Sequence, residues 1–283
     1  MQPIRTLPLR LLQVLVLAAG LATGVRAQPF DVPYVPTPQV VVDEMLTVAG
    51  VGPGDFVIDL GSGDGRIPIT AVRNFGAKAT GVDIDPGRIA ESLQNVKAAG
   101  LDGKVEFVNM DLFKFDLTRA TVITMYLLPR INLRLRPRLF EELKPGTRIV
   151  SHDFSMGDWK PDRLVSIQKN IFYWVIPARI AGKWKMDVEL PIGERSYDIE
   201  LTQRFQEVDG FAKGKARNHP FWEVKLAGSN LRFVLVDEDM GHHFDGEVKG
   251  DVIEGTVYSG AGAERTQAPF RMRRVAAGVV KLE

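Results

Sequence analysis

Between residues 55 and 154, short apolar runs alternate with longer segments in which apolar residues recur every three or four positions. A short apolar run bounded by turn residues is typical of a buried strand, and the three- and four-residue spacing is typical of an amphipathic helix. Strands are predicted near 55–60, 79–84, 105–109, 120–127 and 147–154, and helices near 65–75, 86–99 and 130–143. This alternation predicts an α/β fold class, a Rossmann-like doubly wound domain whose ligands bind at the carboxyl ends of parallel strands.

The stretch before this domain is rich in proline. Residues 28–38 contain four prolines, which favour an extended backbone and exclude a helix. The stretch is either part of the domain or a linker that follows a leader. From Gln39 onward, apolar residues at helical spacing predict a helix that ends at the glycines between 50 and 54.

The pattern changes at about Ile176 to short strands in which apolar and polar residues alternate. Such strands are predicted at 182–190, 196–205, 221–226, 230–236, 244–248 and 252–258. Seven or eight antiparallel strands in about 105 residues predict a small barrel or sandwich. We therefore predict an α/β domain over 28–178, including a hairpin near 166–178, and an antiparallel β domain over 179–283.

The first residues have the pattern of an export signal. Arg5 and Arg10 precede an apolar stretch, residues 11–24, that is too short to span a bilayer, and 25–27 resemble a small-x-small cleavage site. We predict a signal peptide over 1–27, cleaved after Ala27, and a periplasmic or secreted protein with no membrane span after processing. The alternatives are an uncleaved inner-membrane anchor and a mistaken start site.

The balance of charged residues limits the classes of partner that the protein can bind. The 283 residues contain 36 lysines and arginines and 35 acidic residues, for a formal net charge of +1. Because a nucleic-acid-binding surface requires an excess of positive charge, the balance disfavours nucleic acid as a substrate. Cysteine is absent, which fits either an exported or a cytosolic protein.

A glycine-rich turn joins the first predicted strand to the first helix of the α/β domain. It reads Asp59-Leu-Gly61-Ser-Gly63-Asp-Gly65-Arg66. Glycine allows unusual torsions and lets a ligand lie against the backbone, so a nucleotide-like ligand is the first hypothesis. The spacing fails the dinucleotide fingerprint, whose third glycine would fall on Arg66 or Pro68, and no P-loop lysine is present.

Two acidic residues follow neighbouring strands and could hold a nucleoside. Asp83 ends the second strand, where a carboxylate can accept hydrogen bonds from both ribose hydroxyls, and Asp111 follows the third, where it could accept from an adenine amine. The alternatives are a glycine-rich turn of another α/β protein and, for Asp111, an ordinary turn or cap residue. Together the motifs resemble the cofactor site of class I S-adenosylmethionine (SAM) methyltransferases, with these cofactor-binding residues: Asp59, Gly61, Gly63, Gly65, Asp83 and Asp111.

The glycine-rich turn and three further segments carry a closer resemblance, which covers roughly residues 34–161. They are Pro36-Thr-Pro38, the glycine-rich turn, Tyr126-Leu-Leu-Pro129 and the stretch 143–161. Together they are similar to the small lysine methyltransferases that modify the ATP synthase c-subunit and the adenine nucleotide translocator. The resemblance implies that Tyr34 and Thr37 help close the cofactor pocket. It also implies that Tyr126 and Pro129 line the slot through which an amine enters.

The leading hypothesis is a SAM-dependent methyltransferase acting on a protein lysine or another amine. Methyl transfer needs mainly a neutral nucleophile held in line with the methyl group, so a dedicated acid or base need not be visible. SAM is a cytosolic cofactor, and an export signal conflicts with its supply. The alternative is therefore an exported, non-catalytic binding protein whose β domain recognises a ligand or partner.

Two other constellations are not interpreted as sites. Ser151-His152-Asp153 is consecutive, and neighbours on a strand point to opposite faces, so no catalytic triad is predicted. His242 and His243 stand among acidic residues, but we interpret this stretch as a solvated hairpin turn and predict no metal.

Overall fold

The computed structural model describes residues 34–214, 217–262 and 265–282. The predicted signal peptide and the first residues of the predicted α/β domain lie outside the described residues. Among the described residues, no helix has the length and apolar character that crossing a membrane requires.

The α/β part confirms the predicted Rossmann-like fold. Its elements are α1 (Gln39–Val48), β1 (Phe56–Leu60), α2 (Arg66–Phe75), β2 (Lys78–Asp83), α3 (Pro86–Ala98), β3 (Val105–Asn109), β4 (Val122–Met125), α4 (Pro129–Glu142), β5 (Arg148–His152), β6 (Arg163–Ser166) and β7 (Asn170–Val175). The seven-stranded sheet has the order β3-β2-β1-β4-β5-β7-β6. Strands β1 to β5 are parallel, and β7 runs antiparallel between β5 and β6.

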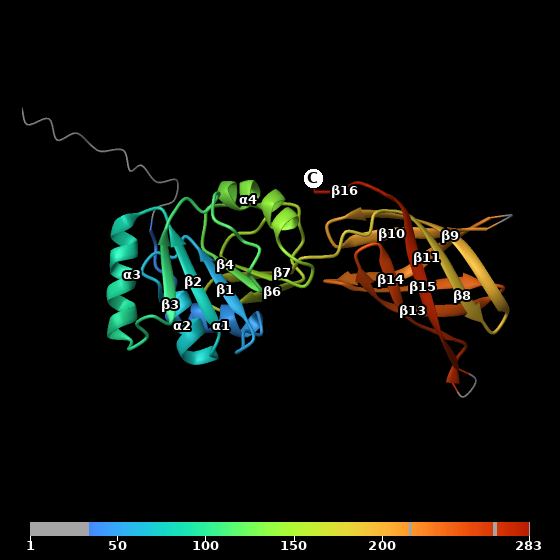
Figure 1. Ribbon diagram of the computed structural model, residues 1–283, viewed down its shortest axis with the longest axis horizontal. Helices are drawn as coiled ribbons and strands as arrows, with labels where there is room; N and C mark the ends of the chain where they lie inside the picture. The colour runs from blue at the N-terminus through green and yellow to red at the C-terminus, as the bar shows by residue number, and fades with distance from the viewer. Residues whose placement is uncertain (1–33, 215–216, 263–264, 283) are drawn as a thin grey trace, which may run out of the picture. The chain divides into compact units, whose positions relative to one another are not determined.

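Helices cover both faces of this sheet (Figure 1). The apolar residues of α1 and α2 pack with Val57, Val122 and Val150, and those of α4 pack on the opposite face with Ile58 and Ile149. The strand order reverses between β1 and β4. In doubly wound sheets a ligand binds beyond the carboxyl ends of the strands at such a reversal. The glycine-rich turn after β1 lies at this point.

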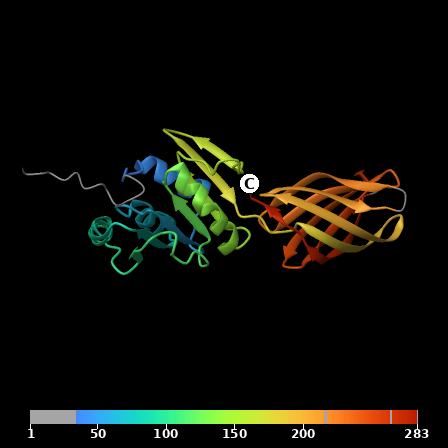
Figure 2. The same cartoon turned by 90° about the horizontal axis from the view of Figure 1, so that it is seen from above.

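The antiparallel part is a closed barrel, which decides between the predicted barrel and sandwich. Its strands are β8 (Gly182–Leu190), β9 (Gly193–Arg204), β10 (Glu207–Lys213), β11 (Asn218–Ala227), β12 (Asn230–Asp237), β13 (Met240–Lys249), β14 (Val252–Ser259) and β15 (Thr266–Ala277), with a short β16 (Val280–Lys281) beside β9. Neighbours in sequence pair throughout, and the pairing of β15 with β8 closes the ring (Figure 2). Trp184, Phe233 and Phe244 are among the buried residues that fill its interior. Eight strands leave an interior just wide enough for side chains.

Two barrel strands were not predicted as separate elements. The interior positions of β10 include Gly210 and the small Ala212, so its alternation of large apolar and polar residues is weak. Strand β15 contains Pro269, which sequence rules assign to a turn or an edge, and only Phe270 and Met272 are buried in it. Both strands are stabilised by backbone pairing with the strands on either side of them. A local sequence pattern does not indicate such pairing.

Side chains from the barrel region complete an aromatic cluster of the α/β part. Phe205, in the turn between β9 and β10, is 2% exposed, and its ring centroid lies 5.9 Å from those of Phe140 and Trp159. The Trp159 indole N–H donates to Gln206 Oε1 at 2.7 Å. The division into domains at residue 178 stays a prediction, but the core of the first part already includes a residue of the second.

We predict that Phe205→Ala destabilises the α/β part. Removing a buried Phe side chain typically costs about 3–5 kcal/mol, because burial is lost and a cavity is left. Thermal unfolding followed by circular dichroism should show a lower midpoint for this variant. Trp222→Ala is the matched control, since Trp222 is 57% exposed on the barrel, and its midpoint should stay close to that of the unaltered chain. Equal midpoints for the two variants would mean that Phe205 does not stabilise the α/β core.

Candidate cofactor and acceptor site

The glycine-rich turn after β1 has the backbone geometry that the sequence predicts. Gly61, Gly63 and Gly65 have φ angles of 78°, 54° and 79°, in the left-handed region that favours glycine. The N–H groups of Gly61 and Ser62 both donate to the Val82 carbonyl, which ties the turn to the end of β2. The turn is therefore held by main-chain bonds, and each glycine is required by its torsion.

Protein side chains also pack closely against these glycines. A Cβ at Gly63 would collide with the ring of Tyr34, and one at Gly65 with the ring of Phe107. A Cβ at Gly61 would lie 2.8 Å from Leu127 Cδ2. Glycine at these positions is thus required by neighbouring side chains, in addition to the close approach of a ligand that the sequence predicts.

Asp83 links the end of β2 to the turn. Its Oδ2 accepts from the Gly63 N–H and its Oδ1 from the Asp85 N–H, both at 2.9 Å. Each carboxylate oxygen has two lone-pair sites, so both can accept a further hydrogen bond from a ribose hydroxyl. The bond to Gly63 also fixes Asp83 against the turn.

Asp111 lies close to Asp83 along the same sheet edge. The Met110 N–H donates to the Asp83 carbonyl at 3.0 Å, which places the residues after β3 beside the end of β2. The Asp111 carboxylate accepts from the Phe113 N–H at 2.9 Å, as in an ordinary turn. Its predicted contact with an adenine amine stays a prediction.

The N-terminal segment, residues 34–38, lies over the turn. Arg66 Nη1 donates to the Thr37 carbonyl at 2.7 Å, and the Arg66 guanidinium pairs with the Asp64 carboxylate at 2.5 Å. The Tyr34 hydroxyl hydrogen-bonds to the same carboxylate, and the Arg88 guanidinium lies 4.5 Å from the centre of the Tyr34 ring. Burial, the Asp64 charge and this hydrogen bond raise the pKa of Tyr34 above its ordinary value. Tyr34 and Thr37 thus contact the glycine-rich turn, and their role in closing a cofactor pocket stays a prediction.

Asp59 is buried beneath the turn, with 2% exposure. Thr124 Oγ1 donates to its carboxylate at 2.7 Å. Burial raises the pKa of Asp59 to about 7, and the nearby Asp83 and Asp64 charges add to this, while the Thr124 hydrogen bond opposes it. Near neutral pH the group therefore lies close to the midpoint of its titration.

Tyr126 follows β4 and packs against His152, the last residue of β5, and Phe154, which follows that strand. Its ring centroid lies 3.9 Å from that of His152 and 5.9 Å from that of Phe154. His152 Nδ1 lies 3.1 Å from Thr37 Oγ1, so the N-terminal segment contacts this cluster as well as the glycine turn. Pro129 begins α4 and is exposed, and its place in an acceptor slot stays a prediction.

The Ser-His-Asp sequence is divided between the two faces of the sheet. Ser151 Oγ donates to the Phe154 carbonyl and lies near Asn132 of α4, whereas His152 contacts Thr37 on the other face. Asp153 pairs with Lys169 at 3.1 Å. The three side chains do not form a relay.

Sequence reasoning missed three residues of this site. Arg66 belongs to the glycine-rich motif, but its contact with the N-terminal segment is not predicted from the sequence. His152 is predicted only not to form a catalytic triad. Ser92 of α3 is buried, and its hydroxyl donates to the Gly63 carbonyl at 2.7 Å. The position of His152 at the end of the fifth predicted strand is the signal that could have found it. Arg66 and Ser92 contact residues distant in sequence, which no local pattern indicates.

The histidines of the barrel lie in a strand, which corrects their interpretation as a turn. Glu238 and Asp239 form the turn, and both have positive φ. His242 is fully buried, with Nδ1 2.7 Å from Ser259 Oγ, and His243 is exposed. Within the described ranges, no three His, Cys, Asp or Glu side chains are grouped closely enough to hold a metal ion.

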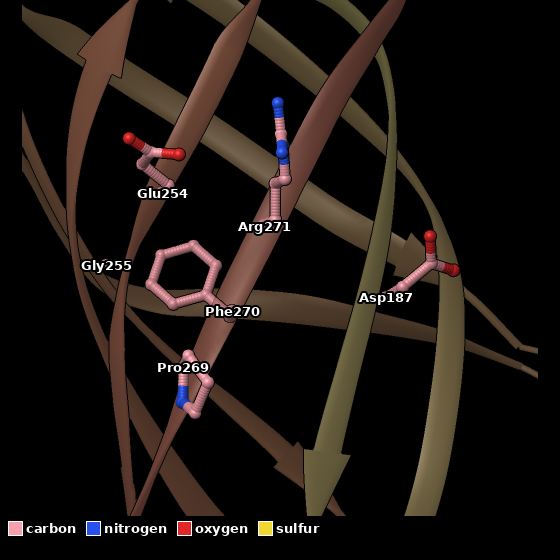
Figure 3. A pocket seen from close by; sticks show the side chains of 6 residues that line it. All are labelled: Asp187, Glu254, Gly255, Pro269, Phe270 and Arg271. Atoms are coloured by element: carbon pink, nitrogen blue, oxygen red, sulfur yellow. The ribbon is translucent and has the colours of Figure 1, made fainter.

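A surface hollow lies on the barrel and does not belong to the candidate site. Its lining residues come from β8, β14 and β15 (Figure 3): Asp187, Glu254, Gly255, Pro269, Phe270 and Arg271. Acidic and basic groups are mixed in it, and Asp187 pairs with Arg273 at 3.2 Å. Nothing in its lining indicates a particular ligand.

We predict that Asp59→Asn changes the pH dependence of stability. The unfolded chain loses the Asp59 proton near pH 3.8, whereas the folded chain keeps it up to about pH 7. The free energy of unfolding therefore falls as the pH rises through this window and stays reduced above it. The amide keeps an acceptor for Thr124 without ionising. At pH 8 the free energy of unfolding of the variant should exceed that of the unaltered chain by up to about a few kcal/mol. This difference should disappear towards pH 4. Urea unfolding at several pH values measures this, and a difference independent of pH would contradict the assignment.

Comparison with known proteins adds to this geometry. Residues 59–163 match the family model described as the ANTKMT methyltransferase domain. A protein-lysine N-methyltransferase of Saccharolobus islandicus is 44% identical over 155 residues, which cover 54% of this chain and 96% of that protein. The adenine nucleotide translocase lysine N-methyltransferase of mouse is 32% identical over 51% of this chain, which spans 64% of that enzyme.

A solved structure extends the comparison to the cofactor. An RNA methyltransferase from Salinibacter ruber, crystallised with S-adenosyl-L-homocysteine, is 52% identical, covers 52% of this chain and 96% of its own, and superposes with a TM-score of 0.51. The left-handed glycine turn and the acceptor capacity of Asp83 fit such a cofactor, so this chain is a SAM-dependent methyltransferase. The chain matches the Saccharolobus enzyme at 44% identity over almost the whole length of that enzyme, and it therefore belongs to the protein-lysine N-methyltransferase family.

Proposed function

We propose that this enzyme transfers a methyl group from SAM to the side-chain amine of a protein lysine. The observation that carries the proposal is the 44% identity with a protein-lysine N-methyltransferase over 96% of that protein. The aromatic cluster of Tyr126, His152 and Phe154 supports it, since it supplies a partly buried surface beside the turn. Nothing in the comparisons favours the alternative of a non-catalytic binding protein.

The roles of the residues follow from their contacts. The backbone of Gly61 to Gly65 would lie against the cofactor, Asp83 would accept from its ribose, and Tyr34 would cover it. When bound, SAM supplies a methyl group on a positively charged sulfur. The ionised form of Asp59 favours this positive charge, so cofactor binding should lower the pKa of Asp59. The protein's main contribution is to position the acceptor and exclude water.

The acceptor must reach the site as a neutral amine, because an ammonium has no lone pair. Transfer of an ammonium from water to the aromatic surface near Tyr126 disfavours its charged form and so lowers its pKa. The Tyr126 ring can also attract the cation before the proton is lost. A lysine side chain could therefore be attracted as the ammonium and then lose its proton more easily than it does in water.

The RNA activity in the name of the Salinibacter protein belongs to that protein, and RNA is the competing acceptor. The balance of 36 basic and 35 acidic residues provides no excess of positive charge for a phosphate backbone. The aromatic cluster of Tyr126, His152 and Phe154 could accommodate either acceptor, so the charge balance is the observation that favours lysine.

We predict that Asp83→Ala weakens SAM binding by roughly 10- to 100-fold, equivalent to about 1.5–3 kcal/mol for a hydrogen bond to a charged group. Isothermal titration with SAM measures the loss. Asp102→Ala is the matched control, because Asp102 is exposed after α3. If Asp83→Ala binds SAM as tightly as the control, Asp83 does not hold the ribose.

We also predict that the full chain methylates lysine in preference to RNA. The purified protein is incubated with radiolabelled SAM and either poly-L-lysine or total transfer RNA, and peptides of a lysine-containing protein acceptor are examined by mass spectrometry. Label should appear in poly-L-lysine, and a mass increase of one methyl group should map to lysine side chains. Asp83→Ala should reduce the label at subsaturating SAM. Label in RNA and none in poly-L-lysine would refute the proposal.

A further inference from the structure

His152 has a feature that the proposed function leaves unexplained. It is the last residue of β5, and its side chain is 1% exposed. Its Nε2 is buried and has no hydrogen-bonding partner among the described residues. Buried polar atoms are normally paired, and an unpaired one at a functional site calls for an explanation.

Two contacts hold the imidazole in one orientation. Nδ1 lies 3.1 Å from Thr37 Oγ1, and the ring lies 3.9 Å from the Tyr126 ring, tilted by 38°. When Nδ1 carries the proton, it donates to Thr37 Oγ1 and leaves a lone pair on Nε2. Thr37 is itself buried, and its carbonyl is held by Arg66, so the orientation depends on the N-terminal segment.

The surroundings keep the ring neutral. Burial lowers the pKa of His152; the Asp153 charge opposes this and the Lys169 charge adds to it. These two neighbours pair with each other at 3.1 Å, which reduces the net field of each at the ring. Tyr126, whose ring packs against the imidazole, is a further ionisable residue beside it. A neutral imidazole can accept a proton at physiological pH.

We propose that His152 Nε2 accepts a proton from the lysine ammonium before methyl transfer. The inference rests on the proposed function, because it requires an acceptor that arrives protonated. His152 packs against Tyr126, which the resemblance places in the acceptor slot, and contacts Thr37, which belongs to the segment over the glycine-rich turn. The base is thus located between the two binding regions.

The step balances. An N–H bond of the ammonium breaks, its electron pair stays on the amine nitrogen, and the proton moves to Nε2. The amine lone pair then forms a bond to the methyl carbon as the C–S bond breaks, and both electrons of that bond remain on sulfur. The products are a methylated ammonium and S-adenosylhomocysteine. His152 then releases its proton to water.

Thr37 connects this base to the cofactor side. Its hydroxyl contacts His152 and its carbonyl accepts from Arg66, which also pairs with Asp64 in the glycine-rich turn. Loss of the hydroxyl in Thr37→Val would leave the ring without its partner at Nδ1. Thr37 is therefore a positioning residue, and His152 is the catalytic base.

The test compares pH–rate profiles for methylation of poly-L-lysine between pH 4.5 and 10. His152→Asn keeps a polar group near the Nδ1 position and removes Nε2. At pH 7 it should lose at least about 100-fold in kcat/KM, the lower range for a general base. The loss should shrink towards pH 10, where lysine amines in solution become neutral. Affinity for S-adenosylhomocysteine should be unchanged. His243→Asn, at an exposed barrel position, is the matched control and should behave as the unaltered chain.

A second measurement covers the case in which His152→Asn does not fold. The unaltered chain should show an inflection in kcat/KM on the acid side, below the ordinary histidine pKa of about 6.5, since burial lowers it. Thr37→Val should shift this inflection. A profile that rises only towards the amine pKa, or a His152→Asn defect that is constant from pH 6 to 10, would overturn the inference. If the unaltered chain methylates RNA and not poly-L-lysine, the proposed function itself fails, whatever the variant does.

Discussion

The structure depends on a left-handed backbone turn against which the side chain of an N-terminal tyrosine packs. Gly61, Gly63 and Gly65 take positive φ angles after β1, and the Tyr34 ring lies directly over Gly63. A side chain at Gly63 would both strain the backbone and displace the ring. Because Asp83 bonds to the Gly63 N–H, the same turn also fixes the end of β2. The torsions of this turn therefore set the positions of the residues that we propose hold the nucleoside.

The N-terminal segment carries this constraint to the acceptor side. The Arg66 side chain extends from the turn and donates to the Thr37 carbonyl. The Thr37 hydroxyl contacts His152, which packs against Tyr126. A chain of adjacent contacts thus joins the proposed cofactor region after β1 and β2 to the aromatic cluster at the ends of β4 and β5. The arrangement suits methyl transfer, in which two reactants must be aligned and protected from water. The barrel contributes Phe205 to the core below.

Much of the fold could be predicted because its signals are local. Apolar runs, helical spacing and the glycine turn each lie within about a dozen residues, and they indicated the α/β sheet, the switch to antiparallel strands and the resemblance to methyltransferases. The contacts that were missed are long-range. Tyr34 over Gly63, Phe205 beside Trp159, and Thr37 at His152 join residues that no periodicity relates. Strand β10 was missed for a different reason, since its small interior residues weaken the alternation.

A crystal structure of the full chain with S-adenosylhomocysteine would show directly whether the N-terminal segment joins the proposed cofactor and acceptor regions into one site. We expect the homocysteine backbone against Gly61 to Gly65, the ribose hydroxyls on Asp83, and the sulfur on the side of Tyr126 and His152. We also expect Thr37 to keep its contact with His152 in the complex. A sulfur that faces away from Tyr126, or a cofactor bound without contact to the glycine turn, would mean that the segment does not join the two regions.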